Sequence, residues 1–154
     1  MYALFTNFEI MTVSRKSKIY FFFEKPMKLV NRSKLKKFLE SLFEREGKKL
    51  QYVNYIFCSD DYLRSINRSY LKHDYFTDIV TFQLSDGRRP IEGEVYISVE
   101  RVTENAVAYG QSRIREVHRV IIHGALHLCG YRDKTRVEKI EMTGKEDQYL
   151  ASYF

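Results

Sequence analysis

The pattern of apolar and polar positions divides the chain into short apolar runs and longer stretches with helical spacing. The short runs are rich in β-branched and aromatic residues and predict strands over 18–24, 50–58, 78–84 and 94–98. Apolar residues three and four apart predict helices over 34–45, 59–69, 99–109, 113–128 and 135–151. Because strands and helices first alternate and helices alone follow, we expect an α+β fold with a small mixed four-stranded sheet packed with about five helices.

The domain organisation follows from length and from the absence of linker sequences. A chain of 154 residues corresponds to about one domain. Two prolines and seven glycines leave no stretch that marks a boundary. Residues 1–10 do not share the pattern that follows them, and Met11 offers an alternative start. We therefore expect a flexible N-terminal extension over 1–10 and a single domain over 11–154.

Charge and cysteine content narrow the class of protein. The formal net charge is +6, and a basic surface attracts polyanions such as nucleic acid, although an ordinary solvated basic surface gives the same count. Cys58 and Cys129 lie far apart and in no paired motif, which is typical of a reducing compartment. No stretch approaches the ~20 apolar residues of a membrane-spanning helix. These features predict a cytoplasmic protein without membrane association.

The segment HGALHLCGYRD, from His123 to Asp133, carries the strongest chemical signal. Residues four apart on a helix point in the same direction, so His123 and His127 can both reach one metal ion. Gly130 can adopt a left-handed conformation that ends the helix and returns the chain, with Asp133, towards the histidines. Two histidines and a carboxylate leave a coordination position open for water, which is typical of a catalytic zinc site. The segment therefore predicts a zincin-like metal-site helix with His123, His127 and Asp133 as ligands of one Zn²⁺ per chain.

A helical wheel of the predicted helix 113–128 separates these histidines from the core. Val117, Ile121, Ala125 and Leu128 form the apolar stripe. Glu116 falls on the face of the two histidines, so we consider it a catalytic candidate that orients His123 as a hydrogen-bond acceptor or activates a water. His118 falls on the core stripe and is expected to be a packed histidine. Cys129 is expected to be a small buried residue, and nothing local pairs with His73.

At this point the residues resemble those of the YbeY family of metal-dependent bacterial endoribonucleases. The family pattern H-G-x-L-H-L-x-G-Y-D-H is matched here through Tyr131. The family segment T-D-V-L-S-F corresponds to residues 77–82, and G-D/E-I-x-I-S to residues 93–98. Glu116 also stands where the family usually has a glutamate. The resemblance covers about residues 60–147, with order and spacing preserved.

The resemblance implies a function and shows two departures from the family. It implies a single-strand-specific, metal-dependent endoribonuclease that acts in maturation of the 16S ribosomal RNA 3′ end and in ribosome quality control, with ribosomal RNA or the small ribosomal subunit as partner. The family's third histidine ligand aligns with Asp133, a harder ligand that can shift metal preference away from zinc. The family's arginine after its tyrosine aligns with Leu71, which leaves the neighbouring Lys72 as the substrate-binding candidate. Further candidates for RNA backbone contacts are Lys34, Lys36, Lys37, Lys48, Lys49, Arg113, Arg115 and Arg119.

Two other functions fit part of the sequence. A zinc metalloprotease uses similar histidine spacing, but it needs a glutamate directly after the first histidine, where this chain has Gly124. A non-catalytic ribosome-assembly or RNA-binding module, stabilised by its metal, fits the basic charge equally well. A closed four-ligand metal site would favour this module, and an open position would favour the enzyme.

Overall fold

The structure is a computed structural model that describes residues 17–154, so the predicted extension over 1–10 lies outside the described residues. The described part contains four strands and five helices, which confirms the predicted α+β class. The strands are β1 (Ile19–Phe23), β2 (Leu50–Cys58), β3 (Ile79–Gln83) and β4 (Ile91–Ser98). The helices are α2 (Arg32–Arg45), α3 (Asp60–Leu71), α4 (Val99–Ala108), α5 (Arg113–Leu128) and α6 (Arg136–Tyr153).

The sheet is mixed, as predicted, and has the strand order β1-β2-β4-β3. β2 pairs in parallel with both β1 and β4, and β3 pairs antiparallel to β4. A strand between parallel neighbours with both faces covered is expected to be apolar almost throughout. β2 fits this expectation, since all of its residues from Val53 to Cys58 are buried.

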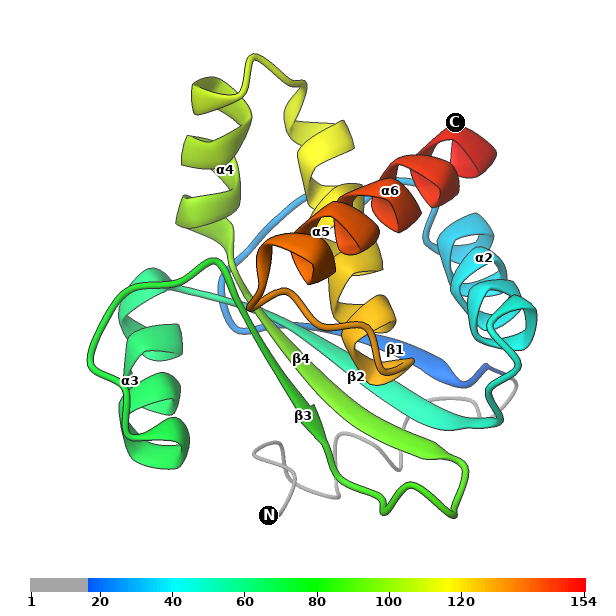
Figure 1. Cartoon of the computed structure of the whole chain (residues 1–154). Helices are drawn as coiled ribbons and strands as arrows, with labels where there is room; N and C mark the ends of the chain where they lie inside the picture. Colours follow the sequence, from blue (N-terminus) through cyan, green and yellow to red (C-terminus); the bar gives the residue numbers. More distant parts are fainter. Residues whose placement is uncertain (1–16) are drawn as a thin grey trace.

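Helix α5 crosses one face of the sheet and is the element that positions the candidate site. Figure 1 shows α5, in yellow to orange, above the sheet and flanked by α2 and α6. The hydroxyl of Tyr55 on β2 donates a hydrogen bond to the carbonyl of Ile121 at 3.0 Å in the buried core. A Cβ at Gly124 would lie 2.7 Å from Cγ1 of Val95, so only glycine permits this approach of α5 to β4. The helix is thereby fixed against the sheet next to both histidines.

The opposite face of the sheet is covered in part by α3. Leu63 and Ile66 pack there against Ile56, Val80 and Tyr96. Among the helices of residues 17–154, none combines the length and apolarity that crossing a membrane requires.

Several predicted boundaries were wrong by two or three residues: the starts of β4 and α2 and the ends of α3 and α6. β4 begins at Ile91 rather than at Glu94, because the amide of Ile91 donates to the carbonyl of Lys49 at 2.8 Å and extends the pairing with β2. α2 begins at Arg32 rather than at Lys34, and the preceding Asn31 adopts a left-handed conformation without capping through its side chain. The predicted capping box of Thr135 and Glu138 at the start of α6 is confirmed.

Candidate metal centre

The two histidines of α5 and the carboxylate of Asp133 converge on one point. Nε2 of His123 and Nε2 of His127 lie 2.9 Å apart. Oδ2 of Asp133 lies 3.4 Å from the first of these nitrogens and 3.3 Å from the second. One ligand atom from each residue lies within 4.8 Å of the others, so this group can hold a metal ion.

The turn after α5 brings Asp133 into place. Gly130 has a φ of 105°, a left-handed conformation that glycine adopts without strain. The amide of Tyr131 then donates to the carbonyl of Leu126 at 3.1 Å, which closes the helix end and reverses the chain. The turn predicted at Gly130 is therefore confirmed.

The Nδ1 atom of each histidine, which points away from the metal centre, donates a hydrogen bond to an acceptor from a different part of the chain. Nδ1 of His123 donates to Oε2 of Glu146 on α6 at 3.2 Å. Nδ1 of His127 donates to the carbonyl of Tyr131 at 3.0 Å. Because a neutral imidazole has one N–H, both Nε2 atoms then carry lone pairs that face the same space.

This arrangement fits a bound cation. Lone pairs on two nitrogens 2.9 Å apart repel each other unless a positive charge lies between them or beside them. Tetrahedral zinc with bonds of about 2.0–2.1 Å sets its ligands about 3.3 Å apart, close to the two distances that Asp133 makes. His123, His127 and Asp133 are therefore the residues that would hold a divalent metal.

The environment affects the two rings differently. Burial lowers the pKa of His127, and the neighbouring His123 lowers it further. Burial also opposes protonation of His123, but Glu146, Asp133 and Asp78 outweigh it and raise the pKa of that ring. These three carboxylates thus favour positive charge next to His123.

A cavity of about 270 Å³ adjoins the histidines and contains several acids. Glu116 lines it and is only 3% exposed, yet its carboxylate forms no hydrogen bond or ion pair with residues 17–154. Burial raises the pKa of Glu116; Arg119 counteracts this effect, and Asp78 and Glu146 add to it. The residues that line the cavity are Asp78, Asn105, Tyr109, Glu116, Arg119, Val120, His123, Asp133 and Glu146.

The structure reassigns one role predicted from the helical wheel. Glu116 shares the cavity with His123, but the acceptor at Nδ1 of His123 is Glu146, so the orienting role predicted for Glu116 was wrong. Arg119, considered for RNA contacts, instead pairs with Glu146 at 3.2 Å and with Asp147 at 2.7 Å. Sequence reasoning missed Glu146, because nothing distinguishes it from the other acids of α6.

Asp78 is the second residue of the site that sequence reasoning did not single out. Its carboxylate accepts a hydrogen bond from Nδ2 of Asn105 at 3.1 Å, and burial raises its pKa. Its position in the T-D segment quoted for the family resemblance was the available signal.

Lys72, the substrate-binding candidate, lies outside the cavity. It follows α3 with a φ of 55°, and its exposed side chain forms no hydrogen bond or ion pair with the described residues. Leu71, which stands at the position of the family's arginine, is also exposed. Leu71 ends α3, and Lys72 begins the loop that leads to Asp78.

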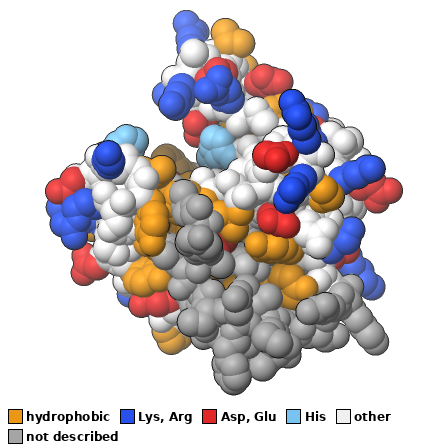
Figure 2. Space-filling model, turned by 90° about the horizontal axis from the view of Figure 1, so that it is seen from below, with side chains coloured by type: hydrophobic (Ala, Val, Ile, Leu, Met, Phe, Trp, Pro, Cys, Tyr) orange, Lys and Arg blue, Asp and Glu red, His pale blue; other side chains and the backbone are white. Residues whose placement is uncertain are grey.

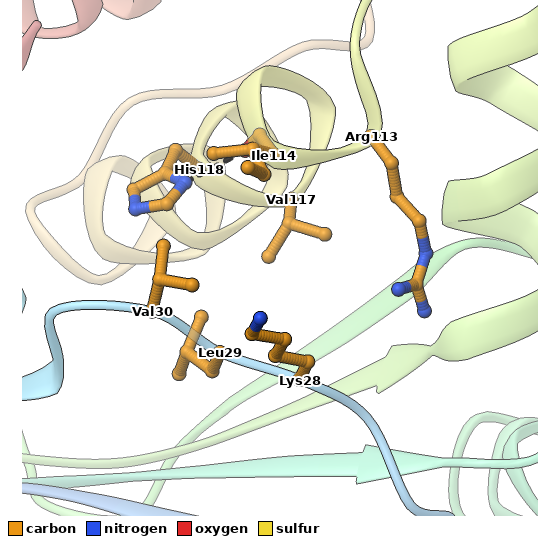
Figure 3. Close-up of a pocket in the computed structure, with 7 residues that line it drawn as sticks. All are labelled: Lys28, Leu29, Val30, Arg113, Ile114, Val117 and His118. Carbon is orange, nitrogen blue, oxygen red and sulfur yellow. Dashed lines mark hydrogen bonds between the residues drawn. The ribbon is translucent and has the colours of Figure 1, made fainter.

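His118 and Cys129 are buried, as predicted, and neither is a candidate ligand. Figure 3 shows His118 at the edge of a separate cavity of about 130 Å³, with Leu29, Val30 and Val117. Its Nδ1 bonds the carbonyl of Ile114 at 2.7 Å, which accounts for its place in the core. Burial raises the pKa of the Cys129 thiol to about 12, so this thiol stays protonated beside the metal centre.

Comparison with known proteins identifies the family. The family described as Endoribonuclease YbeY matches residues 22–154. An Endoribonuclease YbeY of Cytophaga hutchinsonii is 43% identical over 138 residues, covering 88% of this chain and 96% of the relative. One of Phocaeicola vulgatus is 50% identical over 105 residues, covering 68% and 75%.

A solved structure is similar as well. The solution structure of a Thermotoga maritima protein superposes with a TM-score of 0.60 at 29% identity, covering 88% of each chain. The family match spans most of the chain and includes every residue of the candidate metal centre. The chain therefore belongs to the Endoribonuclease YbeY family.

Proposed function

We propose that this chain is a metal-dependent endoribonuclease that hydrolyses phosphodiester bonds in single-stranded RNA. The observation that carries the proposal is the convergence of His123, His127 and Asp133 beside a cavity that contains the unpaired carboxylate of Glu116. Three protein donors leave a tetrahedral ion with an open position, as in catalytic zinc sites. The activity named for the family and for its relatives supports the same reaction.

The groups around the metal centre have different roles in the proposed reaction. A divalent cation would supply Lewis acidity towards the phosphate and acidify a water. Glu146 and the carbonyl of Tyr131 fix the tautomers of the two histidines, so that both Nε2 atoms face inwards. Glu116 accepts a proton from the attacking water, a role suited to a buried carboxylate with a raised pKa.

We propose zinc as the metal, with other divalent ions accepted because of Asp133. Histidine nitrogens and one carboxylate suit zinc, and the carboxylate also suits harder ions such as manganese. A single carboxylate in place of an imidazole makes the site less positive, which reduces its effect on the acidity of water.

The substrate we propose is ribosomal RNA, at the 3′ end of 16S RNA in the small subunit, and the compartment is the cytoplasm. The family's name for its reaction and the net charge of +6 support an RNA substrate. Two buried free cysteines, Cys58 and Cys129, are compatible with a reducing compartment.

The packing of Gly124 argues against a metalloprotease function. A glutamate at this position would place its Cβ 2.7 Å from Cγ1 of Val95 and 3.1 Å from Cδ1 of Ile79. The helix face at Gly124 packs on the sheet, so the general base that those proteases carry at this position has no room.

The test is cleavage of structured ribosomal RNA by the purified, zinc-loaded protein, with His127→Ala as control. We expect cleavage within single-stranded segments by the wild type and only background cleavage by the variant. Equal cleavage rates for the wild type and the variant would refute the nuclease function and favour the non-catalytic ribosome-assembly module. A casein digestion in parallel checks for proteolysis, which we expect to be absent.

A further inference from the structure

Exposed aromatic side chains are concentrated at the end of α3 and in the loop that joins it to β3. The described residues expose ten large hydrophobic side chains, and four of them, Tyr70, Leu71, Tyr75 and Phe76, fall within residues 70–76. We call residues 70–76 the aromatic loop. Exposed apolar side chains that gather in one segment mark an interaction site more often than scattered ones do.

Asn67 of α3 anchors the aromatic loop through two hydrogen bonds. This side chain is only 1% exposed, and its Nδ2 donates to the carbonyl of Tyr75 at 3.1 Å. The carbonyl of Asn67 accepts from the amide of His73 at 3.2 Å. These two hydrogen bonds tie the backbone that carries the exposed rings to α3.

Two kinds of ring contact shape the surface of the loop. His73 stacks on Tyr75 with ring centroids 5.3 Å apart, and its Nδ1 bonds the tyrosine hydroxyl at 3.1 Å. The expectation that nothing local pairs with His73 was therefore wrong. The guanidinium groups of Arg64 and Arg101 lie over the ring of Phe76, at 4.7 and 4.8 Å from its centroid. Tyr75, at 55% exposure, is the most exposed aromatic residue of the loop, with His73 stacked on its ring.

The aromatic loop leads directly into the metal-centre cavity. Asp78 lines that cavity, and Tyr75 precedes it by three residues, so their Cα atoms are at most about 11 Å apart. Arg68 and Lys72 form no ion pair with residues 17–154 and remain available for phosphate groups. Figure 2 shows, on the left lobe that carries α3, exposed hydrophobic side chains together with Lys and Arg side chains and a histidine.

We propose that the aromatic loop is a base-stacking subsite, with Tyr75 as its main platform, for the single-stranded RNA that reaches the metal centre. This inference rests on the proposed function. Each nucleobase has a π-face that stacks on an aromatic ring, and neighbouring cations bind the backbone.

The experiment measures binding separately from cleavage. Zinc-loaded full-length protein is titrated into fluorescein-labelled, 2′-O-methyl oligoadenosine, and fluorescence anisotropy gives the Kd after a gel has shown that the probe is intact. Tyr75→Ala should weaken binding about tenfold. Tyr75→Phe should stay within about twofold, because the ring remains and only the bond to His73 is lost.

Controls separate stacking from loss of structure and from loss of activity. Phe154→Ala removes a ring of similar exposure outside the loop and should leave the Kd unchanged. In a His127→Ala background, which should not cleave RNA, Tyr75→Ala should weaken binding by the same factor as in wild type. A blunt RNA duplex should bind wild type and Tyr75→Ala equally, because its bases are not free to stack.

The outcomes distinguish the subsite from the nuclease. If Tyr75→Ala kept the wild-type Kd while wild type still cleaved RNA, the stacking subsite would be refuted and the nuclease would stand. If Tyr75→Ala lost affinity for RNA while wild type cleaved no RNA, the stacking subsite would be supported and the nuclease function would be refuted. If wild type bound no oligonucleotide, the patch would have to serve a protein partner, and the proposal would be overturned.

Discussion

Glu146 of α6 lies 3.2 Å from Nδ1 of His123 on α5, although 23 residues separate them in the sequence. The same carboxylate pairs with Arg119, so it is held from two directions. An acceptor on the outer nitrogen fixes the ring orientation and raises the basicity of the nitrogen that faces the metal. The affinity of the metal centre therefore depends on how α6 docks.

Replacing Glu146 should weaken metal binding without removing a ligand. Glu146→Ala should raise the Kd for zinc by about 10–100-fold, the range typical of such supporting groups. Glu146→Gln should have a smaller effect, because its amide oxygen still accepts a hydrogen bond. Competition with a chromophoric chelator measures both values.

Asp147 provides the matched control on the same helix. It binds Arg119 but makes no contact with His123, so Asp147→Asn should keep the wild-type Kd. An unchanged affinity in Glu146→Ala would show that α6 does not support the site.

Asp133 should determine both metal content and metal preference. Asp133→Ala should lower the zinc content of purified protein well below that of wild type, because two histidines alone bind weakly. Asp133→His should restore zinc and reduce manganese binding, because imidazole is the softer ligand. Elemental analysis of the purified proteins measures the zinc and manganese content, with a variant of the exposed Asp61, Asp61→Ala, as control. An unchanged zinc content in Asp133→Ala would exclude Asp133 as a ligand.

Glu116→Gln should separate catalysis from stability. The raised pKa means that folded protein holds a proton on Glu116 more tightly than unfolded chain does. The charged carboxylate therefore destabilises the fold at neutral pH, and this cost disappears as the pH falls below the model-peptide value of 4.5.

The glutamine variant should accordingly melt a few °C higher than wild type near neutral pH, and the two should melt alike in acid. RNA cleavage should fall about 100-fold with unchanged zinc content, because the proton acceptor is lost. Glu44→Gln, an exposed acid on α2, should change neither quantity. Full activity in Glu116→Gln would rule out its role as the base.

Gly124→Ala should destabilise the fold through its contact with the sheet. The added methyl would meet Val95 at 2.7 Å, and such overpacking costs about 1–3 kcal/mol. Gly144→Ala on α6 is the matched control, since nothing lies within 4 Å of its Cβ position, and it should gain up to about 1 kcal/mol of helix propensity. Urea unfolding compares the two, and equal effects would contradict the proposed packing role.

Local spacing explains why much of this structure could be predicted from the sequence. The i, i+4 relationship of His123 and His127, the turn at Gly130 and the capping box at Thr135 depend on residues within one or two helical turns. The core stripe of α5 was also correct, because Val117, Ile121, Ala125 and Leu128 are all buried.

The remaining features depend on how distant elements dock. Glu146 reaches His123 only because α6 packs on α5, and a helical wheel of one helix cannot give that angle. β4 begins early because Leu50 pairs with Ile91, a contact that neither segment indicates alone. The burial of Asp78 likewise requires β3 and α4 to meet, since Asn105 of α4 binds its carboxylate.

The placement of all three donors between His123 and Asp133 has a consequence for the order of assembly. Donors that lie within eleven consecutive residues need little loop closure, so their entropic cost is small before the sheet exists. The helix and its turn can therefore capture an ion early during folding. Glu146 can contact His123 only after α6 has packed on α5. Tight binding of the ion therefore indicates that α6 has docked.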